Sequence, residues 1–109
     1  MDEELIFNEL QKMHPDWSDK QIWAAVSIML SSDDVISASG PNVTYSEDLF
    51  RTVLEKAKRW LSETLPDIYA EVADYFNELI DNPSDCAKQG AESQELFLEC
   101  HRLVRKKQL

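Results

Sequence analysis

Apolar residues recur along this chain at intervals of three and four, which is the period of an amphipathic α-helix. The pattern is clearest in residues 65–82, where apolar and acidic residues fall on opposite sides of a helix drawn at about 100° per residue. The apolar side holds Ile68, Tyr69, Val72, Tyr75, Phe76, Leu79 and Ile80, and the acidic side holds Asp67, Glu71, Asp74, Glu78 and Asp81. We therefore predict a helix with one face in the core and a row of carboxylates, about 21 Å long, on the other.

The same period predicts four more helices, and local signals mark several of their ends. They cover residues 2–13, 19–30, 46–64 and 91–106. Ser18 and Gln21 have the spacing of a capping box at the start of the second helix. Pro66 suits the first turn of a new helix, so we expect a tight junction after residue 64 rather than one long rod. We expect Gly90 to weaken or break the short helical stretch that precedes the last helix.

The first two helices differ in how their apolar residues are spread. The buried side of the first is predicted to hold Leu5, Ile6, Leu10 and Met13. The second is apolar around much of its girth, so we expect it to be either the central helix or one side of an interface. Trp23 is the residue we expect at that interface if the helix is only half covered.

The helical period breaks in residues 31–45, which are rich in Ser, Asp, Gly, Pro and Asn. We predict an ordered loop here, with a short hairpin as one option, because residues 35–36 and 43–45 flank a turn-like sequence. A connection of this length is long for a compact helical domain. It is therefore either a binding loop, with Asp33 and Asp34 at an interface, or a simple crossover between helices.

Length and composition favour a single all-α domain. The chain has 109 residues with only two glycines and four prolines, so we expect one compact bundle of about five helices over residues 1–109. No apolar run approaches the roughly 18 residues that span a bilayer, and the first residues are acidic where a signal peptide would be basic. We therefore expect a cytoplasmic protein with no membrane partner, in which Cys86 and Cys100 are reduced thiols.

The charge balance points to a basic protein partner. The chain carries 21 acidic and 11 basic residues, a net charge of −10, which argues against direct binding to nucleic acid because that affinity depends on Lys and Arg. Residues 60–87 contain seven acidic residues and no Lys or Arg. A face shaped only for solubility would mix charges of both signs.

Our leading hypothesis is a non-catalytic interaction module whose acidic face docks on a basic surface of another protein. The predicted partner-binding residues are Glu63, Asp67, Glu71, Asp74, Glu78, Asp81 and Asp85. A phage or mobile-element inhibitor that mimics the charge of nucleic acid, and so blocks a host nuclease or defence complex, would need such a face. The alternative is a solvated face, or one neutralised within the chain by Arg51, Lys58 and the C-terminal bases.

A second hypothesis rests on two carboxylates with ExxD spacing. Glu71 and Asp74 share a helical face, where they could bind Mg²⁺ with help from a neighbouring helix. The surrounding sequence, AEVADYFNEL, locally resembles the helix that carries this motif in the all-α nucleoside triphosphate pyrophosphohydrolases. That resemblance implies a Mg²⁺-dependent nucleotide pyrophosphohydrolase with Glu92 and Glu95 as its second carboxylate pair. In that family the second motif lies on an earlier helix, whereas Glu92 and Glu95 come later in this chain.

Other chemistry has less support in the sequence. Cys100 and His101 are neighbours whose side chains diverge by about 100° on a helix, so we expect no catalytic dyad, with Cys100 in the core and His101 near the surface. His14 and His101 complete no zinc pattern, and we expect neither a metal nor a cofactor. A third hypothesis is a structural homo-oligomer, in its simplest form a homodimer, that uses the apolar second helix.

Overall fold

The structure is a computed structural model and describes residues 3–38, 46–81 and 87–107. Within these ranges it contains six helices and no strand. The helices are α1 (Glu3–Met13), α2 (Asp19–Ser31), α3 (Asp33–Ala38), α4 (Glu47–Thr64), α5 (Pro66–Asp81) and α6 (Ala87–Lys107). The predicted all-α bundle is confirmed, with one more helix than expected.

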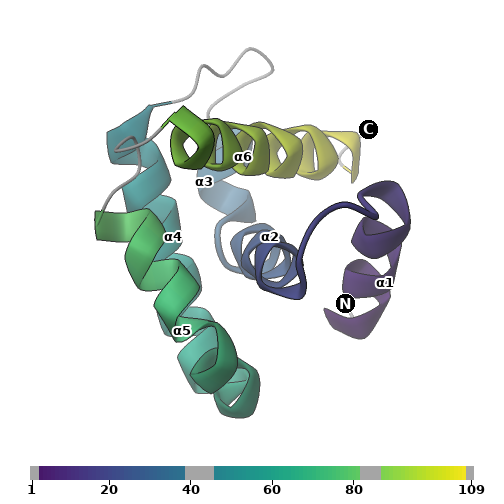
Figure 1. Cartoon of the computed structure of the whole chain (residues 1–109). Helices are drawn as coiled ribbons and strands as arrows, with labels where there is room; N and C mark the ends of the chain where they lie inside the picture. The colour runs from purple at the N-terminus through teal and green to yellow at the C-terminus, as the bar shows by residue number, and fades with distance from the viewer. Residues whose placement is uncertain (1–2, 39–45, 82–86, 108–109) are drawn as a thin grey trace.

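Helix α2 lies at the centre, and the other helices surround it (Figure 1). It packs against all five of them. Ile22 and residues 24–29 are buried, so the apolar girth of this helix is covered by the rest of the chain. Ser27 is the polar member of this buried run, and its Oγ donates a hydrogen bond of 2.7 Å to the carbonyl oxygen of Trp23. Of the two roles predicted for α2, the structure shows the central one.

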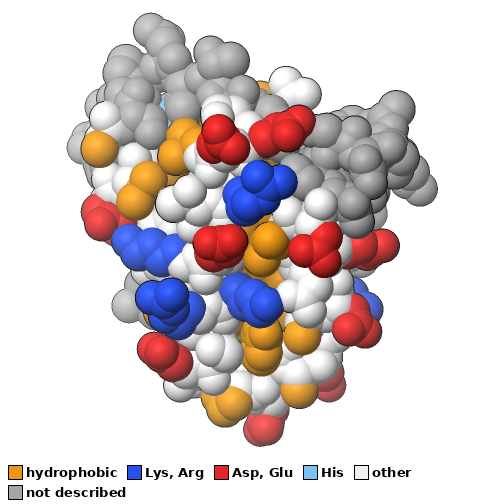
Figure 2. Space-filling view, turned by 90° about the vertical axis from the view of Figure 1, so that its left-hand side faces the viewer, with side chains coloured by type: hydrophobic (Ala, Val, Ile, Leu, Met, Phe, Trp, Pro, Cys, Tyr) orange, Lys and Arg blue, Asp and Glu red, His pale blue; other side chains and the backbone are white. Residues whose placement is uncertain are grey.

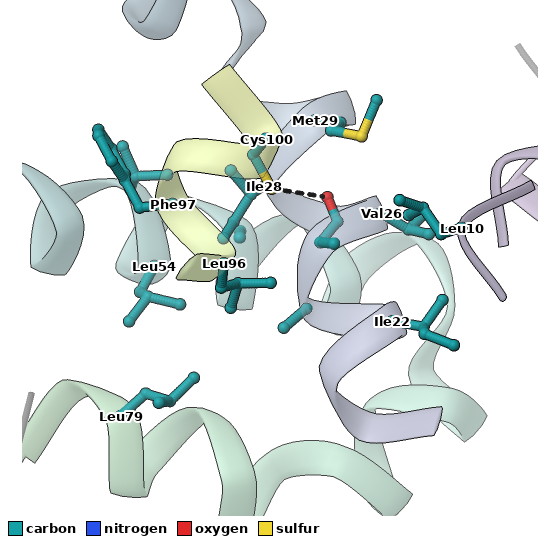
Figure 3. Packing of buried hydrophobic residues seen from close by; sticks show 14 of the residues in the cluster. Leu10, Ile22, Val26, Ile28, Met29, Leu54, Leu79, Leu96, Phe97 and Cys100 are labelled. Carbon is teal, nitrogen blue, oxygen red and sulfur yellow. Dashed lines mark hydrogen bonds between the residues drawn. The ribbon is translucent and has the colours of Figure 1, made fainter. Parts of the chain in front are cut away.

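The buried apolar side chains form one cluster to which all six helices contribute. Figure 3 shows Ile28 of α2 among side chains of α4 and α6, including Leu54 and Phe97. Phe97 also meets Phe50 edge to face, with ring centroids 6.1 Å apart, which is a favoured geometry for an aromatic pair. The core thus ties the second half of the chain to the central helix.

Helices α4 and α5 lie side by side and form a helical hairpin with a very short junction (Figure 1). Ser46 caps the start of α4, where its Oγ accepts a hydrogen bond from the backbone N–H of Leu49. Leu65 ends α4, and its carbonyl oxygen accepts from the N–H of Tyr69 in the first turn of α5. Pro66 occupies the first position of α5, as its fixed φ and missing N–H favour.

The predicted capping box at the start of α2 is confirmed. The backbone N–H of Ser18 donates to Oε1 of Gln21 over 3.0 Å, and the N–H of Gln21 donates to Oγ of Ser18 over 3.3 Å. Trp17 and Ile22, which flank this cap at the spacing of a hydrophobic staple, are both buried in the main cluster. This local signal fixes where α2 begins.

The predicted loop is wrong over residues 33–38, which form helix α3. Ser32 joins α2 to α3, because its N–H donates to Ile28 and its carbonyl oxygen accepts from Ile36. Asp33 and Asp34 lie in the first turn, where the helix dipole favours acidic residues, and Ile36 is buried. The optional hairpin is therefore wrong in its first strand, and residues 43–45 lie outside the described residues.

The predicted break at Gly90 is also wrong, because α6 runs through it from Ala87 to Lys107. Glycine costs a helix about 1 kcal/mol relative to alanine. The C-terminal part of α6 is held on the core by its buried side chains, which are Leu96, Phe97, Cys100, His101 and Val104. The packing of that part outweighs the single unfavourable residue.

The buried side of α1 is narrower than predicted. Ile6 and Leu10 are buried, but Leu5 is 62% exposed and Met13 is 46% exposed. Helix α1 lies at the edge of the molecule, where it packs mainly on α2 (Figure 1). Only a thin stripe of α1 therefore faces the core.

Gly90→Ala should raise the free energy of unfolding by about 0.5–1 kcal/mol, because alanine loses less backbone entropy than glycine in a helix. Chemical denaturation of both proteins measures the difference. As a control, Ala70→Gly at an exposed position of α5 should lower the free energy of unfolding by about 1 kcal/mol. A loss of stability in Gly90→Ala would contradict a helical backbone at residue 90.

Candidate functional site

The acidic face predicted for residues 65–82 is present on α5. The side chains of Val72, Phe76 and Leu79 are buried and fix one side of this helix against the core. The opposite side carries exposed carboxylates, which belong to Asp67, Glu71, Asp74, Glu78 and Asp81. Because the core anchors the helix along its length, the acidic side chains project from a backbone whose orientation is fixed.

Three of these carboxylates form no ion pair with another described side chain, and they lie in the first part of α5. The described ion pairs of the chain involve other acidic residues, and none contains Asp67, Glu71 or Asp74. Glu78 and Asp81, nearer the end of the helix, each take part in a polar interaction within the chain. The part of the row that is open to a partner is therefore its first three members.

Arg51 and Lys58, which the alternative hypothesis assigned to neutralising the row, form other contacts. Lys58 Nζ donates a 2.6 Å hydrogen bond to Oδ1 of Asn77. Arg51 Nε donates to the carbonyl oxygen of Ile80 over 3.2 Å, at the end of α5, and an Arg51 Nη atom lies 3.8 Å from the Asp48 carboxylate. Both bases join α4 to the last turns of α5, where a cation also suits the negative end of the helix dipole. Neither base pairs with the first three carboxylates of the row.

A polar groove of about 430 Å³ lies between α4 and α5. Its walls contain Lys58, Arg59 and Ser62 of α4 and Asn77 and Asp81 of α5, among other residues. In Figure 2, which views the side of the molecule that carries α4 and α5, Lys and Arg side chains lie among Asp and Glu. The acidic row thus has a basic neighbour on α4. In the sequence, the only sign of this basic surface is the cluster of basic residues between Arg51 and Arg59.

The remaining predicted partner-binding residues do not extend the row within the described chain. Glu63 is exposed in the last turn of α4. Asp85 lies outside the described residues. The candidate site is therefore a face of α5, with Glu63 near its beginning in sequence.

The residues predicted at a second interface lie in three different settings. Trp23 is half-buried and packs on Phe7 of α1, with ring centroids 4.8 Å apart. Asp34 is exposed and accepts hydrogen bonds from Lys56 Nζ, which hold the pKa of its carboxyl below the ordinary value. Asp33 is exposed beside it and has a polar interaction of its own. Trp23 thus serves the contact between α1 and α2, and Asp34 the contact between α3 and α4.

The carboxylates of the metal hypothesis are only partly brought together. Glu71 and Asp74 are exposed on one face of α5, and Glu95 is exposed on α6. Glu92 lies in α6, and its side chain is outside the description. Among the described residues, no three His, Cys, Asp or Glu side chains are grouped closely enough to hold a metal ion.

A histidine cluster that the sequence analysis did not identify links the α1–α2 connection to α6. The His14 ring stacks on Trp17 with centroids 3.9 Å apart, and its Nε2 lies 2.9 Å from a carboxylate oxygen of Glu99. The two atoms are close, but their geometry is not that of a hydrogen bond. Arg102 donates to the other oxygen of Glu99. The cluster fastens α1 and α2 to α6 without forming a recognisable catalytic arrangement.

Cys100 is fully buried as predicted, but the expectation that His101 lies near the surface is wrong. His101 is only 6% exposed, because α6 packs against both α2 and α3 and so has more than one covered side. Cys100 Sγ lies 3.7 Å from the carbonyl oxygen of Ala25 and donates to it (Figure 3). Burial, followed by the charge of Glu99, raises the pKa of the Cys100 thiol far above its ordinary value. The residue is therefore a thiol of the core.

The comparisons with known proteins assign no family. No protein-family model, no curated protein and no solved structure matches this chain. Within the described residues, none of the helices combines the length and the apolar character needed to cross a membrane. Function must therefore be argued from the site itself.

Cys100 should be inert toward thiol reagents in the folded protein. In a Cys86→Ser variant, which leaves Cys100 as the only cysteine, native labelling should be at least about 100-fold slower than labelling in denaturant, because the thiol reacts only from open states. A raised pKa also means that the folded state keeps its thiol proton. The raised pKa therefore contributes its whole share of the free energy of unfolding at pH values below the ordinary thiol pKa. This contribution declines as the pH rises above that value.

The labelling time course with a chromogenic disulfide tests the first point, and chemical denaturation tests the second, both between about pH 7 and pH 9. Both rates should rise with pH as the thiolate fraction of the open chain grows, and the native rate should stay at least about 100-fold below the denatured rate. Fast and complete labelling of the folded variant would contradict the buried position of Cys100.

Proposed function

We propose that this protein is a non-catalytic interaction module that docks the acidic face of α5 on a basic surface of a partner protein. The observation that carries the proposal is the set of three exposed carboxylates, Asp67, Glu71 and Asp74, which form no ion pair with a described Lys or Arg. They lie on a helix that the core holds in place, so their spacing is preorganised for a partner.

The energetic cost of the row supports the same conclusion. Asp67, Glu71, Asp74, Glu78 and Asp81 form four successive pairs at i,i+3 or i,i+4. Each like-charge pair opposes helix formation by about 0.2–0.5 kcal/mol, so the row costs about 1–2 kcal/mol in total. A basic partner would offset this repulsion on binding, which makes its contact with the row more favourable than contact with a single carboxylate.

The net charge of −10 extends the attraction beyond direct contact. Opposite charges steer two proteins together and raise the association rate, and the effect weakens as salt screens the charges. The basic residues beside the groove, Lys58 and Arg59, would repel a uniformly basic surface that reached across both helices. The proposed footprint is therefore confined to the outward face of α5.

The narrower form of the proposal concerns the kind of partner. A protein groove that normally receives a nucleic-acid backbone is lined by Lys and Arg residues, which contact successive phosphates. A row of carboxylates on one helix offers such a groove a substitute for that backbone. A phage or mobile-element inhibitor of a host nuclease or defence complex would work in this way, and its setting would be the cytoplasm.

Reversing two central charges should abolish partner capture without unfolding the protein. The variant Glu71→Lys/Asp74→Lys places bases at exposed positions of α5, whereas the control variant Asp16→Lys/Glu95→Lys makes the same change of net charge away from α5. The tagged proteins are incubated with a bacterial lysate at about 50 mM and about 500 mM salt, and bound proteins are quantified by mass spectrometry. Circular dichroism confirms that both variants fold.

The wild type and the control should retain a basic protein at low salt and release it at high salt. The α5 variant should retain at least about tenfold less of that protein, since several charge pairs are lost together. Equal capture by the α5 variant would remove the acidic row from the mechanism. An equal loss in both variants would show that only net charge matters.

Calorimetric titration with Mg²⁺ separates this proposal from the pyrophosphohydrolase hypothesis. We expect no site tighter than about 1 mM, because two exposed carboxylates provide too few ligands for tight binding. A micromolar site that disappears in Glu71→Gln would favour the enzyme instead.

A further inference from the structure

A small hollow between α1 and α2 contains two aromatic side chains that the proposed function does not use. It has a volume of about 270 Å³ and is lined by Glu4, Phe7 and Asn8 of α1 and by Trp23 of α2. The three residues of α1 lie at intervals of three and four, so they share one side of that helix. A hollow of this size is smaller than the usual site of a drug-sized ligand and suits a single side chain.

The apolar wall of the hollow consists of the rings of Phe7 and Trp23. Their centroids are 4.8 Å apart, their planes are inclined by 39°, and both side chains are only partly buried. The face of an aromatic ring attracts cations, and the indole ring of tryptophan attracts them most strongly. Within the described chain, no Lys or Arg forms a cation–π contact with either ring. The wall can therefore receive a cation from another molecule.

The polar rim of the hollow provides hydrogen-bond acceptors. Glu4 and Asn8 are both exposed, and their side chains carry carboxylate and amide oxygens. Glu4 also has an interaction within the chain, but a carboxylate can accept several hydrogen bonds at once. The described residues that line the hollow include neither Lys nor Arg, and the whole chain has a net charge of −10. The rim therefore favours a cation that donates hydrogen bonds.

The combination of ring faces and acceptors favours a guanidinium group over other organic cations. A quaternary ammonium group has no N–H to donate, so it would leave the acceptors of the rim without a partner. The ammonium group of lysine donates hydrogen bonds, but it is a compact point charge with no flat face. The guanidinium group of arginine is planar, stacks on aromatic rings and donates hydrogen bonds from its edge at the same time.

We propose that this hollow binds the guanidinium group of an arginine side chain that a partner protein presents. The planar group stacks on Trp23, and its N–H groups donate to Glu4 and Asn8. Free arginine fits less well, because its α-carboxylate would meet a rim with no base among the described lining residues. The site therefore recognises arginine as part of a polypeptide.

This site is separate from the acidic face of α5, and the inference does not depend on the proposed function. Figure 1 shows α1 on one side of the molecule and the α4–α5 hairpin on the other. The α5 face offers a row of carboxylates, whereas the hollow offers aromatic rings and two acceptors to a single cation. The hollow thus recognises the shape of its ligand as well as its charge.

Titration with N-acetyl-arginine amide, followed by NMR spectroscopy, tests the proposal. This compound has the side chain of an arginine residue and no charged termini, and N-acetyl-lysine amide at the same ionic strength is its matched control. The indole N–H signal of Trp23, identified by its absence in Trp23→Phe, should shift in a saturable way. We expect a dissociation constant of about 1–10 mM, because one stacked cation with a few hydrogen bonds makes a weak site. The lysine compound should bind at least about fivefold more weakly.

Two other signals and variants separate the hollow from general charge effects. The indole signal of Trp60, which is half-buried on α4, should shift at least about fivefold less than that of Trp23. Glu4→Gln should weaken the binding of the arginine compound about three- to tenfold, because the ionised acceptor is lost. Glu9→Gln makes the same change of charge at an exposed position of α1 outside this hollow, and it should have an effect of no more than about twofold. Circular dichroism checks the fold of each variant.

Several results would overturn the proposal. They are the absence of a saturable shift at Trp23, equal shifts at Trp23 and Trp60, equal affinity for the lysine compound, and equal losses in Glu4→Gln and Glu9→Gln. Free L-arginine that binds more tightly than the capped compound would also contradict a site for arginine within a polypeptide. None of these measurements uses the partner of the α5 face, so the two proposals succeed or fail separately.

Discussion

The burial of α2 on all sides is the constraint on which the rest of the structure depends. A helix that is apolar around its girth cannot remain in water, so every other helix must give up one face to cover it. The polar groups that this burial removes from water are paired within the core, as in the contacts of Ser27 with Trp23 and of Cys100 with Ala25. Each surrounding helix therefore packs one face against α2 or its neighbours, and its opposite face is exposed to solvent or to partners.

That division explains why the exposed faces of α5 and α1 have opposite character. Helix α5 is long, and three buried side chains anchor it along its length, so it tolerates a row of like charges that would weaken an isolated helix. Helix α1 lies at the edge and buries only Ile6 and Leu10, so part of its apolar side stays in water. The first surface follows from strong packing, and the second follows from incomplete packing.

The sequence predicted the helices whose signals are local and repeated. The stripes of α4 and α5, the capping box at Ser18 and the junction at Pro66 each depend on residues within a few turns of one another. The missed features depend on tertiary contacts. Helix α3 has six residues, too few to show a period, and its Ile36 is fixed by the core. His101 is buried because α6 packs against both α2 and α3, and the basic wall beside α5 exists only because α4 lies next to it.

The length of the acidic row determines what a partner must provide to engage it. At physiological salt the screening length is about 8 Å, whereas the acidic row extends over about 21 Å. Its ends are therefore electrostatically almost independent, and a partner must place several cations close to the helix to engage them all. Because the core holds the helix that carries Asp67, Glu71 and Asp74 at successive turns, the selectivity of the proposed docking would come from the spacing of those cations. Net charge alone would attract any basic protein, but only one with cations at a pitch of about 5.4 Å would satisfy the row turn by turn.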